Sequence, residues 1–364
     1  MKQVIKLFIL LVCSTHSLNI KSQTSSPNLI IVTTDGLRWQ EIFTGLDENL
    51  LGESIGDSEK SLVPTKPVSR EELMPFTWNT FVKHGNLFGN RDHENYVNTK
   101  NFHRFSYPGY SEIFCGTFDP FVNSNEKKYN KNVSVLEEFN HYNLYRNHIA
   151  VFTSWELFPY ILNQPRSGLR IDAGSIQANK DFTLSSLHSP AKIDPDPSAT
   201  PKSETRSDDL TWQTAMEYTK VNHPKILYIS LDDTDHYGHE GDYDAYAGAI
   251  SQFDKYLEEM WNLIQSDPFY KDNTYFLITT DHGRGTSPTS WKKHGFLPLR
   301  SGEIWYMEYG PGILAKGEVT EPMQQYQASF AYKMAGYLNL NFTPHKLPLE
   351  QEPKSEVLFV SAKE

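Results

Sequence analysis

Four short apolar runs rich in β-branched residues constrain the fold of this 364-residue chain more than any other feature. They lie at residues 26–36, 147–155, 225–233 and 273–283. Strands buried on both faces of a parallel sheet show continuous apolar runs of this kind, whereas half-exposed strands alternate apolar and polar residues. Each run therefore predicts a strand in the interior of a sheet.

Segments with helical periodicity lie between these runs and after the last one. They cover residues 133–142, 210–221, 243–264 and 323–338. Strands that alternate with helices indicate a parallel sheet whose crossover helices cover both faces. We therefore predict an α/β fold of three layers, with a mostly parallel central sheet and helices on both faces.

Two stretches depart from this alternation, residues 45–100 and residues 164–208. The first is polar with few periodic runs, and the second contains a segment rich in proline, serine and charge, which is typical of a surface loop. Although the chain is long enough for two domains, α/β folds of this size are often single. We expect one domain at residues 24–364, with insertions near 45–100 and 164–208.

The N-terminus has the pattern of an export signal. Lys2 and Lys6 flank the start, an apolar core follows at residues 7–13, and residues 17–23 are mostly polar. The apolar core is too short to span a bilayer as a stable helix. We expect residues 1–23 to be a signal peptide, the mature chain to be periplasmic or secreted, and no integral membrane segment to remain after cleavage.

The charge and cysteine content narrow the classes of partner. The net charge is −11 and no strongly basic stripe offsets it, which argues against a nucleic-acid polymer as partner. Cys115 would be the single cysteine of the mature chain, so we expect no intramolecular disulfide. The sequence carries no signal for an oligomeric state.

Acidic residues follow three of the predicted strands. Asp35 follows the first, residues 231–243 (LDDTDHYGHEGDY) follow the third, and Asp281 with His282 follows the fourth. Because ligands bind beyond the carboxyl ends of strands in open parallel sheets, these side chains can converge. Carboxylates and imidazoles together suit Zn²⁺ or Mn²⁺. The alternative is a scaffold with acidic turns, which would bind no metal.

The segment at residues 103–116 offers a nucleophile. Ser106 precedes Tyr-Pro-Gly and a helical stretch, and backbone N–H groups at a helix N-terminus favour an anionic substrate. A serine alkoxide beside a metal would attack phosphorus and form a covalent intermediate. The alternative is that Ser106 or Ser111 only caps the helix.

The order of these pieces resembles the alkaline phosphatase superfamily, and the resemblance runs from Asp35 to His294. The matching elements are IIVTTDG, FSYPGYSEIFCG, DHYGH, TTDHG and WKKHG. In motif style the chain is closest to nucleotide pyrophosphatase/phosphodiesterase members, which carry a hydroxyl residue before an aromatic-Pro pair and an Asp-x-x-x-His motif with Gly before the His. The resemblance implies an alkaline-phosphatase-like catalytic domain.

The resemblance also implies two divalent metal ions, most often Zn²⁺, with Mn²⁺ or Mg²⁺ as alternatives. The implied ligands of one ion are Asp35, Asp281, His282 and the nucleophile Ser106. The implied ligands of the other ion are Asp235, His239 and His294. Such a pair would clamp the attacking and leaving oxygens of an in-line displacement.

The stretch at residues 231–243 can be read in two frames, because Asp232 and His236 have the same spacing as Asp235 and His239. Gly238 precedes His239, as in the superfamily motif, and a ligand loop that bends sharply needs glycine. We therefore favour Asp235 and His239 as the ligands. Asp232 and His236 are then expected to be neighbours that orient a ligand.

Residues around the proposed nucleophile and the acidic strand ends have two readings each. Phe105, Tyr107 and Tyr110 could stack on a nucleoside or aryl group of a substrate, or could be core residues. Arg38 and Arg284 could contact a phosphate oxygen, or could lie exposed on the surface.

The resemblance favours an exported, metal-dependent phosphoric ester hydrolase that acts on a small phosphate ester, with a slight preference for diesters. The alternatives are a phosphomonoesterase, a phosphoglycerate-mutase-like phosphotransferase, or an inactive member that binds metal or phosphorylated glycans. Formylglycine sulfatases need an arginine at the position of Tyr110, so a sulfatase is not expected.

Overall fold

The computed structural model of the chain describes residues 26–51, 68–174 and 205–346. The predicted signal peptide at residues 1–23 lies outside these ranges, as do parts of the two predicted insertions, residues 52–67 and 175–204. No helix within the described ranges is both long enough and apolar enough to cross a membrane.

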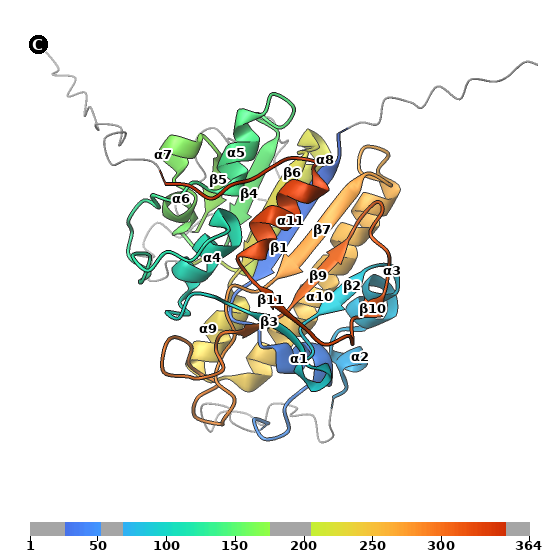
Figure 1. Cartoon of the computed structure of the whole chain (residues 1–364). Helices are drawn as coiled ribbons and strands as arrows, with labels where there is room; N and C mark the ends of the chain where they lie inside the picture. Colours follow the sequence, from blue (N-terminus) through green and yellow to red (C-terminus); the bar gives the residue numbers. More distant parts are fainter. Residues whose placement is uncertain (1–25, 52–67, 175–204, 347–364) are drawn as a thin grey trace, which may run out of the picture.

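A mostly parallel sheet forms the centre of the molecule (Figure 1). Its strand order is β10-β2-β9-β7-β1-β6-β4-β5 in the part of the chain that the structure describes. The strands from β7 to β5 are mutually parallel, and β9 runs antiparallel to both β7 and β2. The bounds are β1 Asn28–Thr34, β2 Asn86–Phe88, β4 Ile149–Thr153, β5 Arg170–Ala173, β6 Ile226–Leu231, β7 Thr274–Thr279, β9 Tyr306–Tyr309 and β10 Gly317–Glu318.

A second, smaller sheet has the order β11-β3-β8. Its strands are β3 Asn95–Asn98, β8 Glu303–Ile304 and β11 Met323–Tyr326. The described part of the polar region at 45–100 therefore supplies β2 to the main sheet and β3 to the small one.

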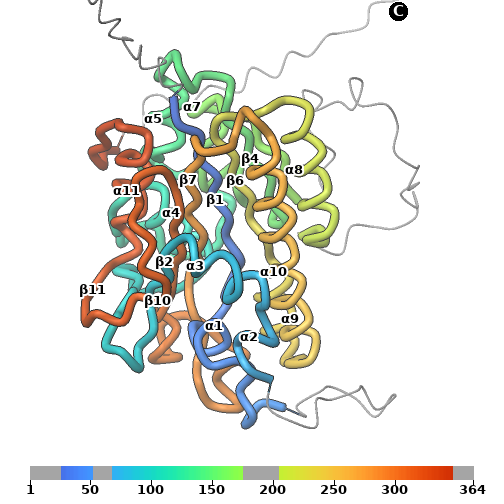
Figure 2. Tube along the Cα trace, turned by 90° about the vertical axis from the view of Figure 1, so that its right-hand side faces the viewer, coloured from blue at the N-terminus to red at the C-terminus, as the bar shows by residue number. Residues whose placement is uncertain are grey.

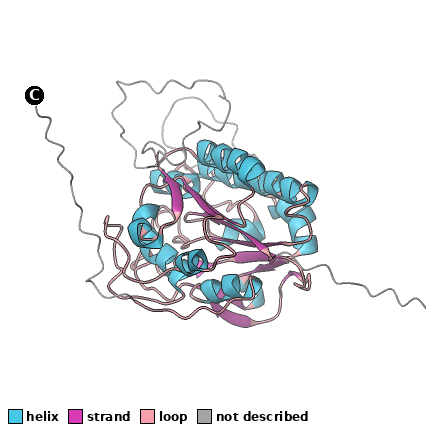
Figure 3. Cartoon of the chain, turned by 90° about the horizontal axis from the view of Figure 1, so that it is seen from above, coloured by secondary structure: helices cyan, strands magenta, loops and turns pink. Residues whose placement is uncertain are grey.

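Helices pack on both faces of the central sheet (Figure 2, Figure 3). The first half of the chain contributes α1 Trp39–Thr44, α2 Arg70–Leu73, η1 Thr77–Phe81, α3 Val82–His84, η2 Arg91–His93, α4 Ser106–Cys115, α5 Val135–His141, α6 Phe158–Ile161 and α7 Gln164–Ser167. The second half contributes α8 Asp208–Asn222, α9 Asp233–Glu240, α10 Tyr243–Ser266 and α11 Ser329–Tyr337.

The side chains of β1 show how the two faces are filled. Ile30 and Val32 belong to one buried cluster, with residues of α1, α8 and α10. Leu29 and Ile31 belong to the other, with residues of α4, α5, α6 and α11. Because successive side chains of a strand point to opposite faces, a fully buried strand requires helices on both sides. The predicted three-layer α/β class is confirmed.

The four predicted strands and the first three predicted helices occur where the sequence places them, with ends that differ by a few residues. The helix predicted at 323–338 is wrong in its first part, since residues Met323–Tyr326 form β11 and the helix begins at Ser329. Pairing of β11 with β3 satisfies the backbone of Met323–Tyr326, so tertiary contacts override the local helical pattern.

Candidate metal centre

The acidic residues after β1, β6 and β7 gather at one edge of the sheet. Strand β1 lies between β6 and β7 and pairs with both in parallel. Asp35 directly follows β1, Asp281 lies two residues beyond β7, and Asp235 lies in α9, which follows β6. The topology therefore brings together residues that are far apart in the sequence, as the predicted parallel sheet requires.

One group consists of Asp35, Asp281 and His282, all buried, whose ligand atoms lie within 4.8 Å of one another. His282 Nε2 is 3.4 Å from Asp35 Oδ1, 3.4 Å from Asp281 Oδ2 and 3.3 Å from Ser106 Oγ. Four ligands about 2.1 Å from a tetrahedral Zn²⁺ are about 3.4 Å from one another. The three measured separations match that edge length.

In each carboxylate of this group, one oxygen accepts a hydrogen bond and the other oxygen does not. Tyr110 Oη donates to Asp35 Oδ2 at 3.1 Å, and the Gly36 N–H donates to Asp281 Oδ1 at 3.1 Å. Asp35 Oδ1 and Asp281 Oδ2 are buried without any hydrogen-bond partner. Buried polar atoms without a partner are costly. These two oxygens face His282 Nε2, so the residues fit a bound cation.

Ser106 is the first residue of α4, and Phe105 occupies the N-cap position. The alternative reading of Ser106 as a helix cap is therefore wrong. In the first turn of α4 the Tyr107 N–H donates to Asn125 Oδ1 and Pro108 has no N–H, so neither of these two residues offers a donor to an anion. What α4 does provide is a buried hydroxyl at the edge of the metal-ligand group.

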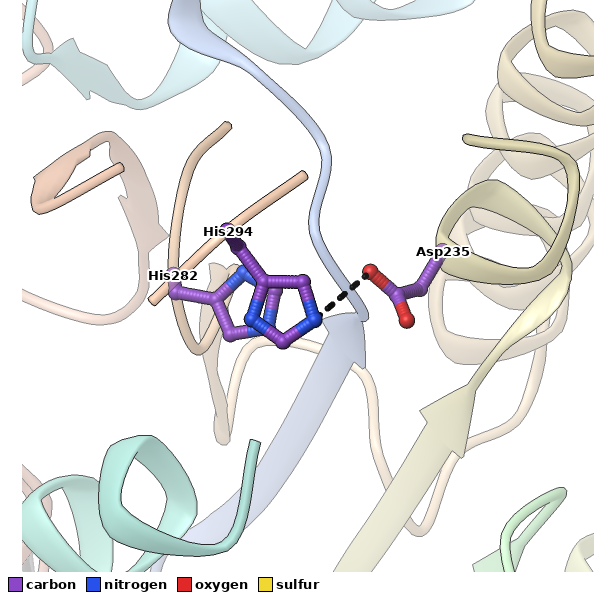
Figure 4. Close-up of side chains that lie close together, drawn as sticks. All are labelled: Asp235, His282 and His294. Atoms are coloured by element: carbon purple, nitrogen blue, oxygen red, sulfur yellow. Dashed lines mark ion pairs between the residues drawn. The ribbon is translucent and has the colours of Figure 1, made fainter. Parts of the chain in front are cut away.

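A second group lies beside the first and contains Asp235, His239 and His294. His239 Nε2 is 3.1 Å from Asp235 Oδ2 and 2.9 Å from His294 Nε2. His294 Nε2 is 3.9 Å from Asp235 Oδ1, along the dashed line of Figure 4. The rings of His282 and His294 stack at 3.9 Å between centroids. Asp235, His282 and His294 also offer ligand atoms within 4.8 Å, so the two groups are contiguous.

Both buried histidines present Nε2 to the centre. His282 Nδ1 donates to Gly283 O at 3.0 Å, and His294 Nδ1 donates to Arg104 O at 2.9 Å. A neutral imidazole that donates through Nδ1 keeps its lone pair on Nε2. Backbone acceptors of this kind orient metal-binding histidines.

The helical conformation of α9, rather than a bend at Gly238, brings the side chains of Asp235 and His239 together. Residues Asp233–Glu240 form a continuous helix, so Gly238 is not a bend. Residues four apart lie on one face of a helix, which brings Asp235 and His239 together. Gly238 is needed for another reason, because a Cβ atom there would lie 2.6 Å from Arg284 Cζ.

Arg284 is fully buried and forms an ion pair with Asp235. Its Nε donates to Trp291 O at 2.7 Å and its Nη2 donates to Lys292 O at 2.9 Å. An exposed position for Arg284 is therefore wrong. Arg38 is also buried and pairs with Glu41 rather than facing the centre. Every guanidinium nitrogen of both arginines is already bonded within the protein.

The charges of the centre are those of a cation site. Burial and the nearby Asp281 and Asp235 raise the pKa of Asp35 well above its usual value. Burial and Asp235 raise the pKa of Asp281 likewise. Burial alone would raise the pKa of Asp235, but Arg284 and His294 hold it well below its usual value. Crowded carboxylates of this kind are stabilised by a divalent ion.

Burial also keeps the histidines neutral. It lowers the pKa of His282 well below its usual value, with His294 as a further cause. Burial and Arg284 lower the pKa of His294 to about 4, against the opposing effect of Asp235. Neutral imidazole is the form that binds metals.

Asp232 and His236, the alternative ligand pair in residues 231–243, lie in different surroundings. His236 is half exposed and lies 3.4 Å from Glu240, on the surface of α9. Its expected role in orienting a ligand is wrong. Asp232 is the N-cap residue of α9, and burial with Asp235 raises its pKa well above the usual value. The raised pKa favours the protonated, neutral form of Asp232 beside the ligands.

The match to a family model agrees with a metal centre, and the similar solved structures identify the fold. Residues 195–298 match the family model described as the Metalloenzyme superfamily. The lipoteichoic acid synthase LtaP from Listeria monocytogenes has a TM-score of 0.55 and 14% identity, over 86% of this chain and 72% of that one. An alkaline phosphatase superfamily protein from Vibrio parahaemolyticus has a TM-score of 0.50 and 12% identity, over 89% and 68%. The fold is that of the alkaline phosphatase superfamily.

A further similar structure is murine ectonucleotide pyrophosphatase/phosphodiesterase 5. It has a TM-score of 0.50 and 13% identity, over 88% of this chain and 97% of that one. Among the curated proteins no sequence matches this chain. The resemblance read from five short motifs is therefore confirmed at the level of the fold.

Proposed function

We propose that this chain is an exported, metal-dependent phosphoric ester hydrolase that uses Ser106 as its nucleophile. The observation that carries the proposal is the convergence of Ser106 Oγ, Asp35 Oδ1 and Asp281 Oδ2 on His282 Nε2, at 3.3, 3.4 and 3.4 Å. Two buried carboxylate oxygens that lack hydrogen-bond partners and face one imidazole nitrogen support a bound cation.

Two divalent ions, most often zinc in proteins with this fold, would occupy the centre. Asp35, Asp281, His282 and Ser106 would hold one, and Asp235, His239 and His294 the other. When bound, such ions lower the pKa of a coordinated hydroxyl and neutralise the charge that develops on a transferring phosphoryl group.

The residues of the chain carry out the other roles in the reaction. Ser106 Oγ attacks phosphorus, the bond from phosphorus to the ester oxygen breaks, and the alcohol leaves. Water hydrolyses the resulting phosphoserine and regenerates the hydroxyl. Tyr110 and the Gly36 N–H hold the two carboxylates of the first group in place.

Arg284 and a backbone carbonyl orient the ligands of the second group. Arg284 fixes Asp235 and the carbonyls of Trp291 and Lys292, in the segment that leads to His294. Arg104 O fixes the His294 ring. Geometry held to within fractions of an ångström is what in-line displacement requires.

Export and the single-domain organisation belong to the same proposal. Export is supported by the charge and apolar pattern of residues 1–23, and the single domain by one continuous sheet that includes strands from both ends of the described chain.

The test combines metal analysis with a small substrate panel. The purified protein should hold two divalent ions and hydrolyse nitrophenyl phosphate or bis-nitrophenyl phosphate, with little turnover of nitrophenyl sulfate. The relative rates on the first two esters decide between monoesterase and diesterase activity. Ser106→Ala should keep at least the second ion and lose turnover by a factor of about 10³ or more. Full activity of Ser106→Ala would show that another group is the nucleophile.

A further inference from the structure

A pocket of about 600 Å³ opens beside the candidate metal centre. Its lining includes Phe105, Lys293, His294, Phe296 and Leu297. The ring of Phe105, the residue before the proposed nucleophile, is 6.0 Å from the ring of His294. A phosphate ester bound at Ser106 would therefore direct its organic group toward this pocket. The pocket has the size of a small-molecule site.

The pocket wall continues into an apolar surface. Phe296 is 65% exposed, Leu297 is 83% exposed and Leu299 is 86% exposed. Phe102 is also exposed, and its ring is 6.4 Å from that of Phe296. A small soluble substrate inside the pocket would leave most of this surface in water. A contiguous exposed apolar patch beside a site marks a ligand or membrane contact.

The backbone of the loop that carries these residues is held in place. Ser301 Oγ lies 2.8 Å from Gly295 O and 2.7 Å from Pro298 O, so its single hydroxyl hydrogen bridges these two carbonyls. Arg104 Nη1 donates to Leu299 O at 3.0 Å. Leu297 and Leu299 are therefore exposed in a loop whose backbone is held by hydrogen bonds.

The charge of the loop is opposite to that of the chain. Between Asp281 and Glu303 the sequence contains four basic residues and no acidic one, although the net charge of the chain is −11. Of these, Arg284 is buried in its pair with Asp235, whereas Lys293 and Arg300 are exposed next to the apolar side chains, and Arg300 also pairs with Glu303. Exposed apolar side chains flanked by Lys and Arg are typical of segments that bind an anionic lipid surface.

We propose that residues 291–300 dock the active site on an anionic lipid surface and that the substrate is a phospholipid. The phosphate would reach Ser106 from the headgroup region, and the apolar part would lie against Phe105, Phe296 and Leu297. The choice of substrate rests on the proposed function, whereas the docking does not.

Docking is tested on the full mature protein without any turnover, by sedimentation with vesicles of phosphatidylcholine alone or mixed equally with phosphatidylglycerol. We expect binding to the mixed vesicles. The double change Leu297→Ser and Leu299→Ser should weaken it about tenfold or more. Lys293→Glu should weaken it about fivefold on the anionic vesicles. Leu314→Ser, at a 75% exposed leucine between β9 and β10, is the matched control and should bind like wild type.

The substrate class is tested with phosphatidylglycerol and its deacylated counterpart, glycerophosphoglycerol, which share the same phosphodiester. We expect at least a tenfold higher kcat/KM for the lipid, and the double leucine variant should lose that preference through KM. Equal turnover of both esters, or vesicle binding unaffected by the double variant, would overturn the proposal. Vesicle binding without turnover of any phosphate ester would instead reject the proposed hydrolase function.

Discussion

Arg284 forms a buried ion pair with Asp235, and its other donors bond the carbonyls of Trp291 and Lys292. One side chain thus ties α9, which carries two candidate ligands, to the loop that carries His294. Gly238 and Gly36 leave the space that the guanidinium and the carboxylate occupy. The arginine also compensates one negative charge in a centre crowded with carboxylates.

Replacing Arg284 should therefore affect the metal-free protein more than the metal-bound one. Arg284→Met leaves Asp235 buried without its partner, and breaking a buried pair costs roughly 3–5 kcal/mol. A bound divalent ion compensates Asp235, so the cost should be smaller in its presence. Denaturant unfolding with and without a chelator measures both values. Arg300→Met, at an exposed ion pair with Glu303, is the control and should cost less than about 1 kcal/mol.

The two histidines of α9 allow a matched test of which Asp/His pair in residues 231–243 binds metal. The side chains of His239 and His236 are each 50% exposed, but only His239 lies against Asp235 and His294. We expect His239→Ala to weaken the binding of one ion by about a hundredfold, and His236→Ala to leave both affinities unchanged. Metal titration monitored by calorimetry distinguishes them. The reverse outcome would place the ligands in the other frame.

Gly238 should be intolerant of alanine for a steric reason. A Cβ atom at this position would lie 2.6 Å from Arg284 Cζ, and forcing an atom into such a packed site costs about 1–3 kcal/mol. Gly248 lies in α10 with nothing within 4 Å of its Cβ position. Gly248→Ala should instead stabilise the protein by about 0.5–1 kcal/mol. Similar effects of both changes on unfolding would contradict the close approach of Arg284.

Metal binding should release protons from the carboxyl groups of the first ligand group. In the metal-free protein the pKa of Asp35 and that of Asp281 are raised, because burial and neighbouring carboxylates disfavour the charged forms. A divalent ion binds the deprotonated forms, so affinity should rise as the pH rises through the raised pKa values. Calorimetry in buffers of different ionisation enthalpy counts the released protons. Affinity that is independent of pH in this range would show that both carboxylates are already charged.

Much of the fold could be predicted because it depends on local patterns. The continuous apolar runs that become β1, β4, β6 and β7 require burial on both faces, and parallel pairing places the acidic residues that follow β1, β6 and β7 at one edge. Asp35, Asp281, His282 and Ser106 could be predicted for that reason together with the resemblance. Their convergence within 3.4 Å could only be seen in the structure.

The remaining features depend on contacts between distant segments. Strand β11 has a helical pattern, but its pairing with β3 decides its conformation. The helical state of α9 was not predicted, since its eight residues carry few apolar side chains. The burial of Arg284 could not be predicted either, because the glycines that make room for it lie at positions 36 and 238.

The positions of the candidate ligands in the sequence determine when each ligand group can form during synthesis or export. The candidate ligands extend from Asp35 to His294, and each group includes at least one residue beyond position 280. A nascent or partly threaded chain that ends before β7 contains neither complete group. With the proposed ligands, stoichiometric metal content would therefore require synthesis and folding beyond β7, and a chain exported unfolded would acquire its ions at its destination.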